Sequence, residues 1–188
     1  MITQEVKKTV FTAKNGEQVT LRKVREEDAQ DIIEAVKSII DSGAYIQKER
    51  PRTIQEEIDF ISDMKEKNNL YLGVELKGKI VGIARVIRGE LEMKKHTGLF
   101  RTWLGDSAQG LGIGKELMSA TLEWCRTNSL HKLCLTVFAS NEVALKLYKK
   151  YGFVVEGIQR EQAILNGKFD DEIHMAYFFS NTLDNNSH

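Results

Sequence analysis

Four apolar, β-branched runs separated by turn signals predict two β-hairpins in the first half of the chain. The runs cover residues 9–13, 18–24, 70–76 and 79–87. The first two are joined through Asn15-Gly16, a dipeptide that favours hairpins because both residues tolerate a positive φ. The second two lie on either side of Lys77-Gly78. We therefore expect each pair of runs to form two antiparallel strands.

Two helices are predicted between these hairpins, because apolar residues there recur every three or four positions. The first covers residues 26–40, and the second begins at Thr53. Thr53 and Glu56 have the spacing of a capping box, in which two side chains satisfy backbone groups at a helix start. The apolar face of the second helix is predicted to carry three isoleucines, Ile54, Ile58 and Ile61.

The second half of the chain predicts strands and helices in alternation. Strands are expected at residues 97–104, 133–138, 153–165 and 171–179, and helices at 112–127 and 142–151. Segment 97–138 is expected to form a right-handed parallel crossover. The last two strands are joined across Asn166-Gly167. The fold class predicted from this order is α/β with a mixed sheet.

Composition favours one globular domain and weakens several functions. Of the 188 residues, 41% are hydrophobic and 29% are charged, as in soluble proteins. The 27 basic and 27 acidic side chains cancel, which argues against a nucleic-acid-binding protein. No apolar run approaches the roughly 18 residues of a membrane span, and residues 1–10 lack the apolar stretch of a signal peptide. We therefore expect a cytoplasmic protein that binds neither nucleic acid nor membrane.

The cysteines and histidines are too scattered to indicate a metal site or a disulfide framework. Cys125 lies in a predicted helix whose apolar face packs inward, and Cys134 lies in an apolar strand. We interpret both as buried structural thiols. No metal is predicted.

The densest chemical signal is a glycine-rich turn between a predicted strand and a predicted helix. Gly110, Gly112 and Gly114 alternate there, and backbone without Cβ atoms can approach a ligand closely. The first amides of the helix lack internal partners and favour an anion such as a pyrophosphate. A glycine-rich turn that only connects a strand to a helix would have the same sequence pattern. The dinucleotide motif is not met, since Lys115 stands where its third glycine is needed. The Walker A motif is not met either, since Gln109 stands where its first glycine is needed.

The turn resembles a motif of the GNAT acetyltransferases. Gln109-x-x-Gly112-x-Gly114 matches the family's (Arg/Gln)-x-x-Gly-x-(Gly/Ala) pattern, although the preceding residues lack the proline and aromatic often found there. The resemblance implies that acetyl-CoA is the cosubstrate and that backbone amides of the turn bind its pyrophosphate. The residues given this role are Gln109, Gly110, Leu111, Gly112, Ile113, Gly114 and Lys115.

A second segment is similar to the same family. Residues 141–153 match its N-x-x-A-x-x-L-Y-x-x-x-G-F run at every fixed position. The resemblance implies that Asn141 helps to seat the pantetheine arm, and that Tyr148 is catalytic, with its hydroxyl near the coenzyme sulfur. Asn141 is also a good helix N-cap, and Tyr148 could instead be a core aromatic. By the same resemblance, backbone groups at Trp103 and Leu104 bond the pantetheine amides.

The resemblance covers about residues 19–179 and implies the GNAT fold, a mostly antiparallel sheet splayed at a central parallel strand pair. Residues 1–18 would be an N-terminal extension with a hairpin strand, and 180–188 a frayed tail. Segment 166–175 is more loosely similar to ribosomal-protein N-terminal acetyltransferases. The implied reaction moves an acetyl group to a primary amine by direct attack in a ternary complex. No general base is assigned.

The acceptor and two other functions remain open. A small molecule or a protein N-terminus would serve as the amine, and a mixed polar loop with Tyr45, Glu49, Arg50 and Arg52 lies near the expected acceptor mouth. A non-catalytic acyl-CoA binding or sensing module would keep the glycine turn but need not keep Tyr148. A nucleotide-binding protein is the third reading, and the missing Walker residues count against it. The family resemblance also implies a homodimer as one oligomeric state.

Overall fold

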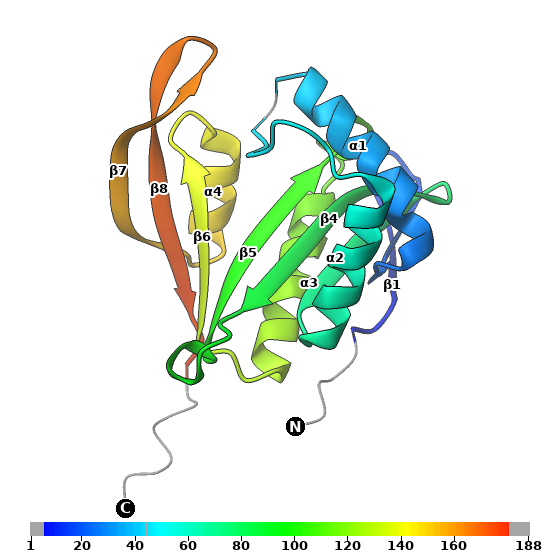
Figure 1. Ribbon diagram of the computed structural model, residues 1–188, viewed down its shortest axis with the longest axis horizontal. Coiled ribbons are helices and arrows are strands. Elements are labelled where there is room, and N and C mark those ends of the chain that lie inside the picture. Colours follow the sequence, from blue (N-terminus) through cyan, green and yellow to red (C-terminus); the bar gives the residue numbers. More distant parts are fainter. Residues whose placement is uncertain (1–5, 44, 181–188) are drawn as a thin grey trace, which may run out of the picture. The chain divides into compact units, whose positions relative to one another are not determined.

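The computed structural model describes residues 6–43 and 45–180 (Figure 1). Contacts within the chain divide them into two compact units. The first unit contains the residues up to Ile87 together with Arg101–Asn128, and the second contains Arg88–Phe100 together with the residues from Ser129 onward. Strand β5 (Thr97–Leu104) contributes its first half to the second unit and its last half to the first.

The helices and strands follow the order predicted from the sequence. The first unit holds β1 (Thr9–Thr12), β2 (Gln18–Lys23), α1 (Ala29–Asp41), α2 (Ile54–Glu66), β3 (Leu70–Leu76), nearly all of β4 (Lys79–Arg88) and α3 (Ile113–Thr127). The second holds β6 (Lys132–Phe138), α4 (Glu142–Lys150), β7 (Val154–Leu165) and β8 (Lys168–Phe178). Three short 3-10 turns were not predicted: η1 (Glu26–Asp28), η2 (Glu92–Lys94) and η3 (Asp106–Ala108).

The described strands form a mixed sheet in the order β1-β2-β3-β4-β5-β6-β8-β7. The ladders β1–β2, β2–β3, β3–β4, β6–β8 and β7–β8 are antiparallel. Strands β5 and β6 are parallel, and their ladder pairs Thr97–Leu99 with Lys132–Cys134. The predicted α/β class with one parallel pair is therefore confirmed. The right-handedness of the crossover stays a prediction.

The turns show which residues need left-handed backbone. In the first hairpin only Gly16 has a positive φ, of 85°. Asn15 does not, and its side-chain Oδ1 accepts a hydrogen bond from the Glu17 amide at 3.1 Å within the turn. In the turns at 77–78 and 166–167, by contrast, both residues have positive φ values. All three hairpins are confirmed.

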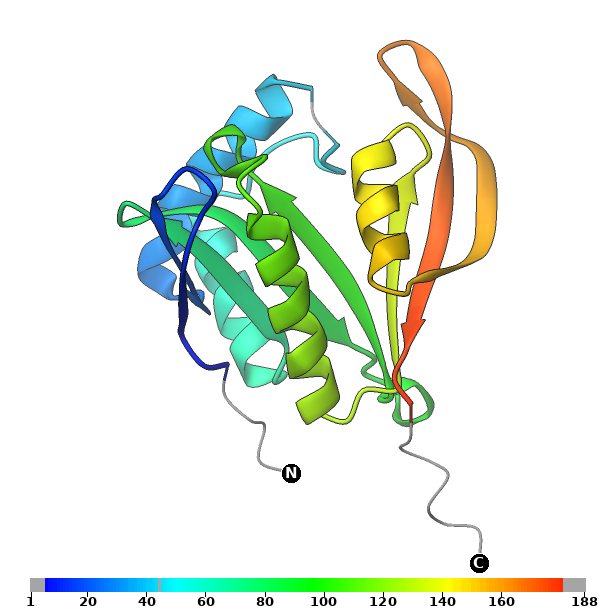
Figure 2. The same ribbon diagram turned by 180° about the vertical axis from the view of Figure 1, so that it is seen from behind.

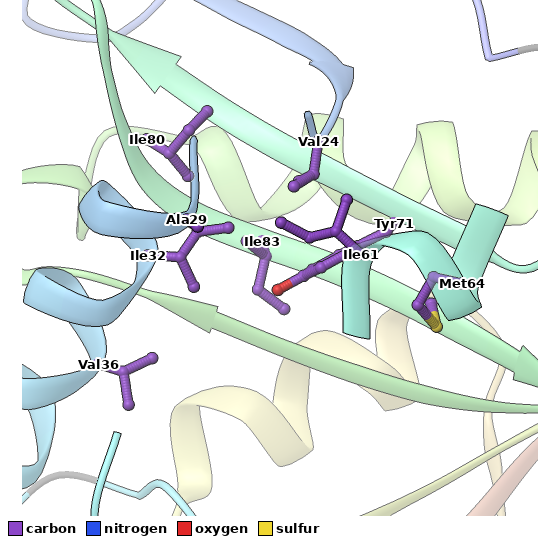
Figure 3. Packing of buried hydrophobic residues seen from close by; sticks show 9 residues of the cluster. All are labelled: Val24, Ala29, Ile32, Val36, Ile61, Met64, Tyr71, Ile80 and Ile83. Atoms are coloured by element: carbon purple, nitrogen blue, oxygen red, sulfur yellow. The ribbon is translucent and has the colours of Figure 1, made fainter. Parts of the chain in front are cut away.

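A hydrophobic cluster in the first unit packs α1 and α2 against β3 and β4 (Figure 3). Its buried members are Val24, Ala29, Ile32, Val36, Ile61, Met64, Tyr71, Ile80 and Ile83. Helix α3 covers the opposite face of these strands (Figure 2). The prediction for Ile54 is wrong: it begins α2, is 48% exposed and takes no part in the cluster, whereas Ile58 and Ile61 do.

The ends of the chain carry predictions that the structure does not test. Residues 1–5 of the expected extension and 181–188 of the expected tail lie outside the described residues. The division at residues 18 and 179 therefore stays a prediction. Among the helices that the structure describes, none combines the length and the apolar character needed to cross a membrane.

Candidate functional site

The glycine-rich turn lies in the first unit and forms the start of α3. Gly110 has a φ of 72° and Gly112 a φ of 81°, values that side chains with a Cβ rarely adopt. Gly112 is the N-cap of α3 and supplies no side-chain cap. The first amides of α3 therefore have no acceptor within the helix. A Cβ at Gly110 would meet nothing within 4 Å, so the backbone there is open to a ligand.

A lysine from the first hairpin lies beside this turn. The Lys14 amide donates a hydrogen bond to the Leu111 carbonyl at 3.2 Å. A Cβ built on Gly112 would lie 3.6 Å from Lys14 Cε, so the lysine side chain runs alongside the turn. The cation adds to the positive end of the helix dipole and favours an anion there. Sequence reasoning missed Lys14, because no motif joins it to residues almost a hundred positions later.

The side chain of Gln109 has a structural partner. Its Nε2 donates a hydrogen bond to the Leu104 carbonyl at 3.0 Å and so links the two ends of the connection between β5 and α3. The Gly105 amide donates to the Val81 carbonyl at 2.8 Å, which fixes the end of β5 against β4. Trp103 packs against the hydrophobic cluster. These contacts hold the turn in place, and the coenzyme roles of Gln109, Trp103 and Leu104 stay predictions.

Asn141 and Tyr148 lie on α4 in the second unit, and both have structural roles. Asn141 caps α4, since its Oδ1 accepts a hydrogen bond from the Ala144 amide at 3.3 Å. Tyr148 is 8% exposed. Its ring lies edge-on to Phe100, with centroids 6.3 Å apart, and 5.7 Å from the Phe153 centroid. The cap and the core-aromatic interpretations are therefore correct, and the coenzyme contacts of both residues stay predictions.

The two cysteines differ in burial. Cys125 is buried as predicted, whereas Cys134 is half-buried, because it stands on the less covered face of β6. Burial raises the pKa of the Cys134 thiol, which lowers its nucleophilicity near neutral pH. Among residues 6–43 and 45–180, no group of three or more potential metal ligands gathers.

The polar loop before α2 is organised by two arginine–glutamate pairs. Arg50 forms a two-pronged ion pair with Glu56, at 2.8 and 3.0 Å, and both side chains are exposed. Arg52 donates to Glu57 at 2.9 Å. Glu57 is buried, with 2% of its surface exposed, so this second pair is desolvated. Among the loop residues named from the sequence, Arg52 thus joins a buried charge.

Lys48 lies in the same loop and was not singled out from the sequence. Burial, together with the positive charges of Arg52 and Arg85, lowers the pKa of its ammonium to about 8. An open depression of about 530 Å³ is lined by Lys48, Arg52 and three neighbours, Glu49, Arg50 and Glu56.

Comparison with known proteins assigns the chain to a family. The model of the acetyltransferase (GNAT) family matches residues 33–153, which include both sequence motifs. The chain belongs to this family.

Individual relatives are more distant. The L-amino acid N-acetyltransferase AaaT of Escherichia coli (strain K12) is 30% identical over 102 residues, which cover 54% of this chain and 63% of that relative. The chain therefore spans less than two thirds of its length. A solved GNAT acetyltransferase from Streptococcus pneumoniae is 27% identical, with a TM-score of 0.77 over 86% of this chain and 99% of that one. The yncA protein of Salmonella typhimurium, solved with its cofactor acetyl-CoA, shares the fold at 18% identity, with a TM-score of 0.79 over 88% and 96% of the chains.

The pKa of Lys48 predicts how stability depends on pH. The folded chain lowers this pKa from 10.5 to about 8, so between these values the unfolded chain binds more protons. The free energy of unfolding then rises with pH, which means that charging Lys48 costs stability below pH 8. We expect Lys48→Met to be more stable than the parent near neutral pH. Its advantage should shrink across this interval, as measured by urea unfolding.

Lys37→Met is the matched control, because Lys37 is an exposed lysine on α1. For this variant, the difference in stability from the parent should stay constant over the same pH range. A Lys48→Met protein that is less stable than the parent near neutral pH, or whose stability difference is constant with pH, would contradict the assignment.

Proposed function

We propose that this GNAT protein is an N-acetyltransferase that moves the acetyl group of acetyl-CoA to a primary amine. The observation that carries the proposal is the turn at the head of α3. Two left-handed glycines, Gly110 and Gly112, present helix-start amides beside the cation of Lys14. The turn itself lies within residues 33–153, which match the family. Amides at a helix start together with a lysine suit a pyrophosphate.

The residues of the turn fit this group. In our proposal the amides from Gln109 to Lys115 hold the pyrophosphate, and Lys14 adds a positive charge. Backbone groups at Trp103 and Leu104 bond the pantetheine amides. Asn141 contributes to seating the same arm while it caps α4. Acetyl-CoA enters as a cosubstrate, and the proposal requires no metal.

The proposed chemistry is direct transfer. The amine nitrogen forms a bond to the thioester carbonyl carbon, the C–S bond breaks, and the leaving sulfur takes a proton from the Tyr148 hydroxyl. The nitrogen loses one proton to solvent as the amide forms, and Tyr148 regains a proton from solvent. A main-chain N–H near Leu104 stabilises the oxygen that gains charge, and such a donor typically contributes about 100- to 1,000-fold in rate. Holding both reactants together supplies roughly 7–11 kcal/mol. No covalent enzyme intermediate is needed, in keeping with the buried Cys125 and the raised pKa of Cys134.

The pyrophosphate role predicts the effect of an acidic side chain in the turn. Gly112→Asp places a carboxylate where the anion is proposed to bind and should weaken acetyl-CoA binding by about 100-fold, since hydrogen bonds to charged groups are each worth roughly 1.5–3 kcal/mol. Isothermal calorimetry with acetyl-CoA measures this.

Gly16→Asp is the control. Gly16 has a nearly equal φ of 85°, and a Cβ there meets nothing within 4 Å. Both variants therefore carry the strain of a left-handed non-glycine residue, but only Gly112→Asp alters the glycine-rich turn before α3. Equal affinities for acetyl-CoA in the two folded variants would refute the pyrophosphate site.

The acid role predicts a loss of turnover in Tyr148→Phe. The ring contacts with Phe100 and Phe153 persist, so acetyl-CoA affinity should stay within a few-fold of the parent value. General acids typically contribute about 100- to 10,000-fold, and the low end applies here because a thiolate already leaves well. Steady-state turnover with a confirmed acceptor, under conditions where chemistry limits the rate, measures the effect.

Tyr177→Phe is matched to this variant, because the Tyr177 ring lies 5.6 Å from the Phe153 ring in the same aromatic group. It should retain the turnover of the parent. Parental turnover in Tyr148→Phe would mean that the Tyr148 ring only packs. Acetyl-CoA binding without turnover on any amine in the parent would favour the non-catalytic acyl-CoA module.

A further inference from the structure

Three cations lie near one buried carboxylate in the first unit. The cations, named here the cationic cluster, are Lys48, Arg52 and Arg85, and the carboxylate is Glu57. The positive charges of Arg52 and Arg85 both act on Lys48, and those of Arg52 and Arg101 both act on Arg85. Glu57 is the carboxylate that acts on Lys48 and on Arg85. The cluster therefore carries more positive charge than its own carboxylate neutralises.

The pairing of β3 and β4 explains why these residues meet. Arg85 stands directly opposite Tyr71 in the antiparallel ladder, so both side chains lie on the face covered by α1 and α2. The Tyr71 hydroxyl donates to Glu57 Oε1 at 2.7 Å. Arg52 donates to Glu57 Oε2 at 2.9 Å. Both oxygens of Glu57 are thus engaged by residues other than Arg85 and Lys48.

The Phe60 ring holds the two arginines close together. The Arg52 Cζ atom lies 3.8 Å from the ring centroid and the Arg85 Cζ atom 5.1 Å from it. A guanidinium that contacts an aromatic ring keeps N–H groups available to an anion. The Arg85 Nε atom is buried, and no hydrogen-bond partner reaches it among the described residues. A buried donor of this kind is costly unless a ligand satisfies it.

The cationic cluster has the properties of an anion-binding site. Unneutralised like charges repel one another and resist burial. Burial is the main cause that lowers the pKa values of both Lys48 and Arg85, and nearby cations add to it. The open depression lined by Lys48 and Arg52 gives a ligand access from solvent.

We propose that Lys48, Arg52 and Arg85 bind a carboxylate of the acceptor, which makes the acceptor an amine that also carries a carboxylate, as amino acids do. The inference rests on the proposed function. Strand β5 links the cationic cluster to the proposed acetyl-CoA site, because Arg101, whose charge acts on Arg85, is two residues before Trp103 on this strand, and the Trp103 backbone is proposed to bond the pantetheine amides. A polyamine would add further positive charge to the cluster and be repelled.

Pairs of amines that differ by one carboxylate test the proposal. The pairs are L-phenylalanine with phenethylamine, L-methionine with 3-(methylthio)propylamine, and L-ornithine with putrescine. Acetyl-CoA consumption is measured for each amine. We expect kcat/KM for at least one amino acid to exceed that of its decarboxylated partner about 10-fold or more, because the lost charge-assisted hydrogen bonds are strong.

Variants identify the residues responsible. Arg85→Gln and Lys48→Gln should each remove most of this preference by raising KM for the amino acid, while kcat/KM for the decarboxylated partner changes by no more than about two-fold. Arg126→Gln is the control, because Arg126 is exposed on α3 and pairs with Glu123. It should leave the preference unchanged. An unchanged preference in both Arg85→Gln and Lys48→Gln would overturn the proposal.

The remaining outcomes separate this inference from the proposed function. If decarboxylated amines or putrescine are acetylated as well as the amino acids or better, the carboxylate site is wrong and the transferase stands. If no amine is acetylated, the proposed function fails. The same pairs are then compared by calorimetry with coenzyme A present, and equal or absent binding of both members overturns the carboxylate site as well.

Discussion

The burial of Glu57 is the constraint on which the α1–α2 side of the first unit depends. A carboxylate that is 2% exposed must be paired and hydrogen-bonded, because an isolated buried charge costs several kcal/mol. Tyr71 and Arg52 meet this need from β3 and from the loop before α2. Arg52 is thereby placed on the Phe60 ring, which Arg85 also contacts. Satisfying one buried carboxylate therefore concentrates positive charge on this face.

Much of the fold could be predicted from the sequence because its local signals agree with one another. Hairpin turns with glycine, a capping box at Thr53 and a glycine after α4 fix where elements begin and end. The errors in the predicted elements arise where tertiary packing and strand pairing, rather than local sequence, determine which residues are buried or paired. Ile54 has the right spacing for the buried face of α2 but lies in the first turn, where the cluster does not reach it. Strand β8 begins at Lys168, before the predicted 171, because its pairing with β7 continues to the turn.

The candidate site was less predictable. The motifs around Gly112 and Tyr148 are continuous in the sequence and could be found there. Lys14 and Arg85 could not, because each reaches its neighbours only through strand pairing and a contact between distant segments. In the sequence, the loop around Lys48 has the charge pattern of any polar surface loop. Its surplus of positive charge exists only after β4 has brought Arg85 to it. The acceptor, the cytoplasmic location and the oligomeric state stay predictions.

Initial-rate kinetics test the central claim most directly, since direct acetyl transfer requires acetyl-CoA and an amine to be bound together. Rates of coenzyme A release are measured while both concentrations are varied, with acetylated amine confirmed by mass spectrometry. The account predicts reciprocal plots that intersect to the left of the axis and no acetylated cysteine. Parallel lines together with acetyl on Cys125 or Cys134, or no coenzyme A release with any amine, would contradict it.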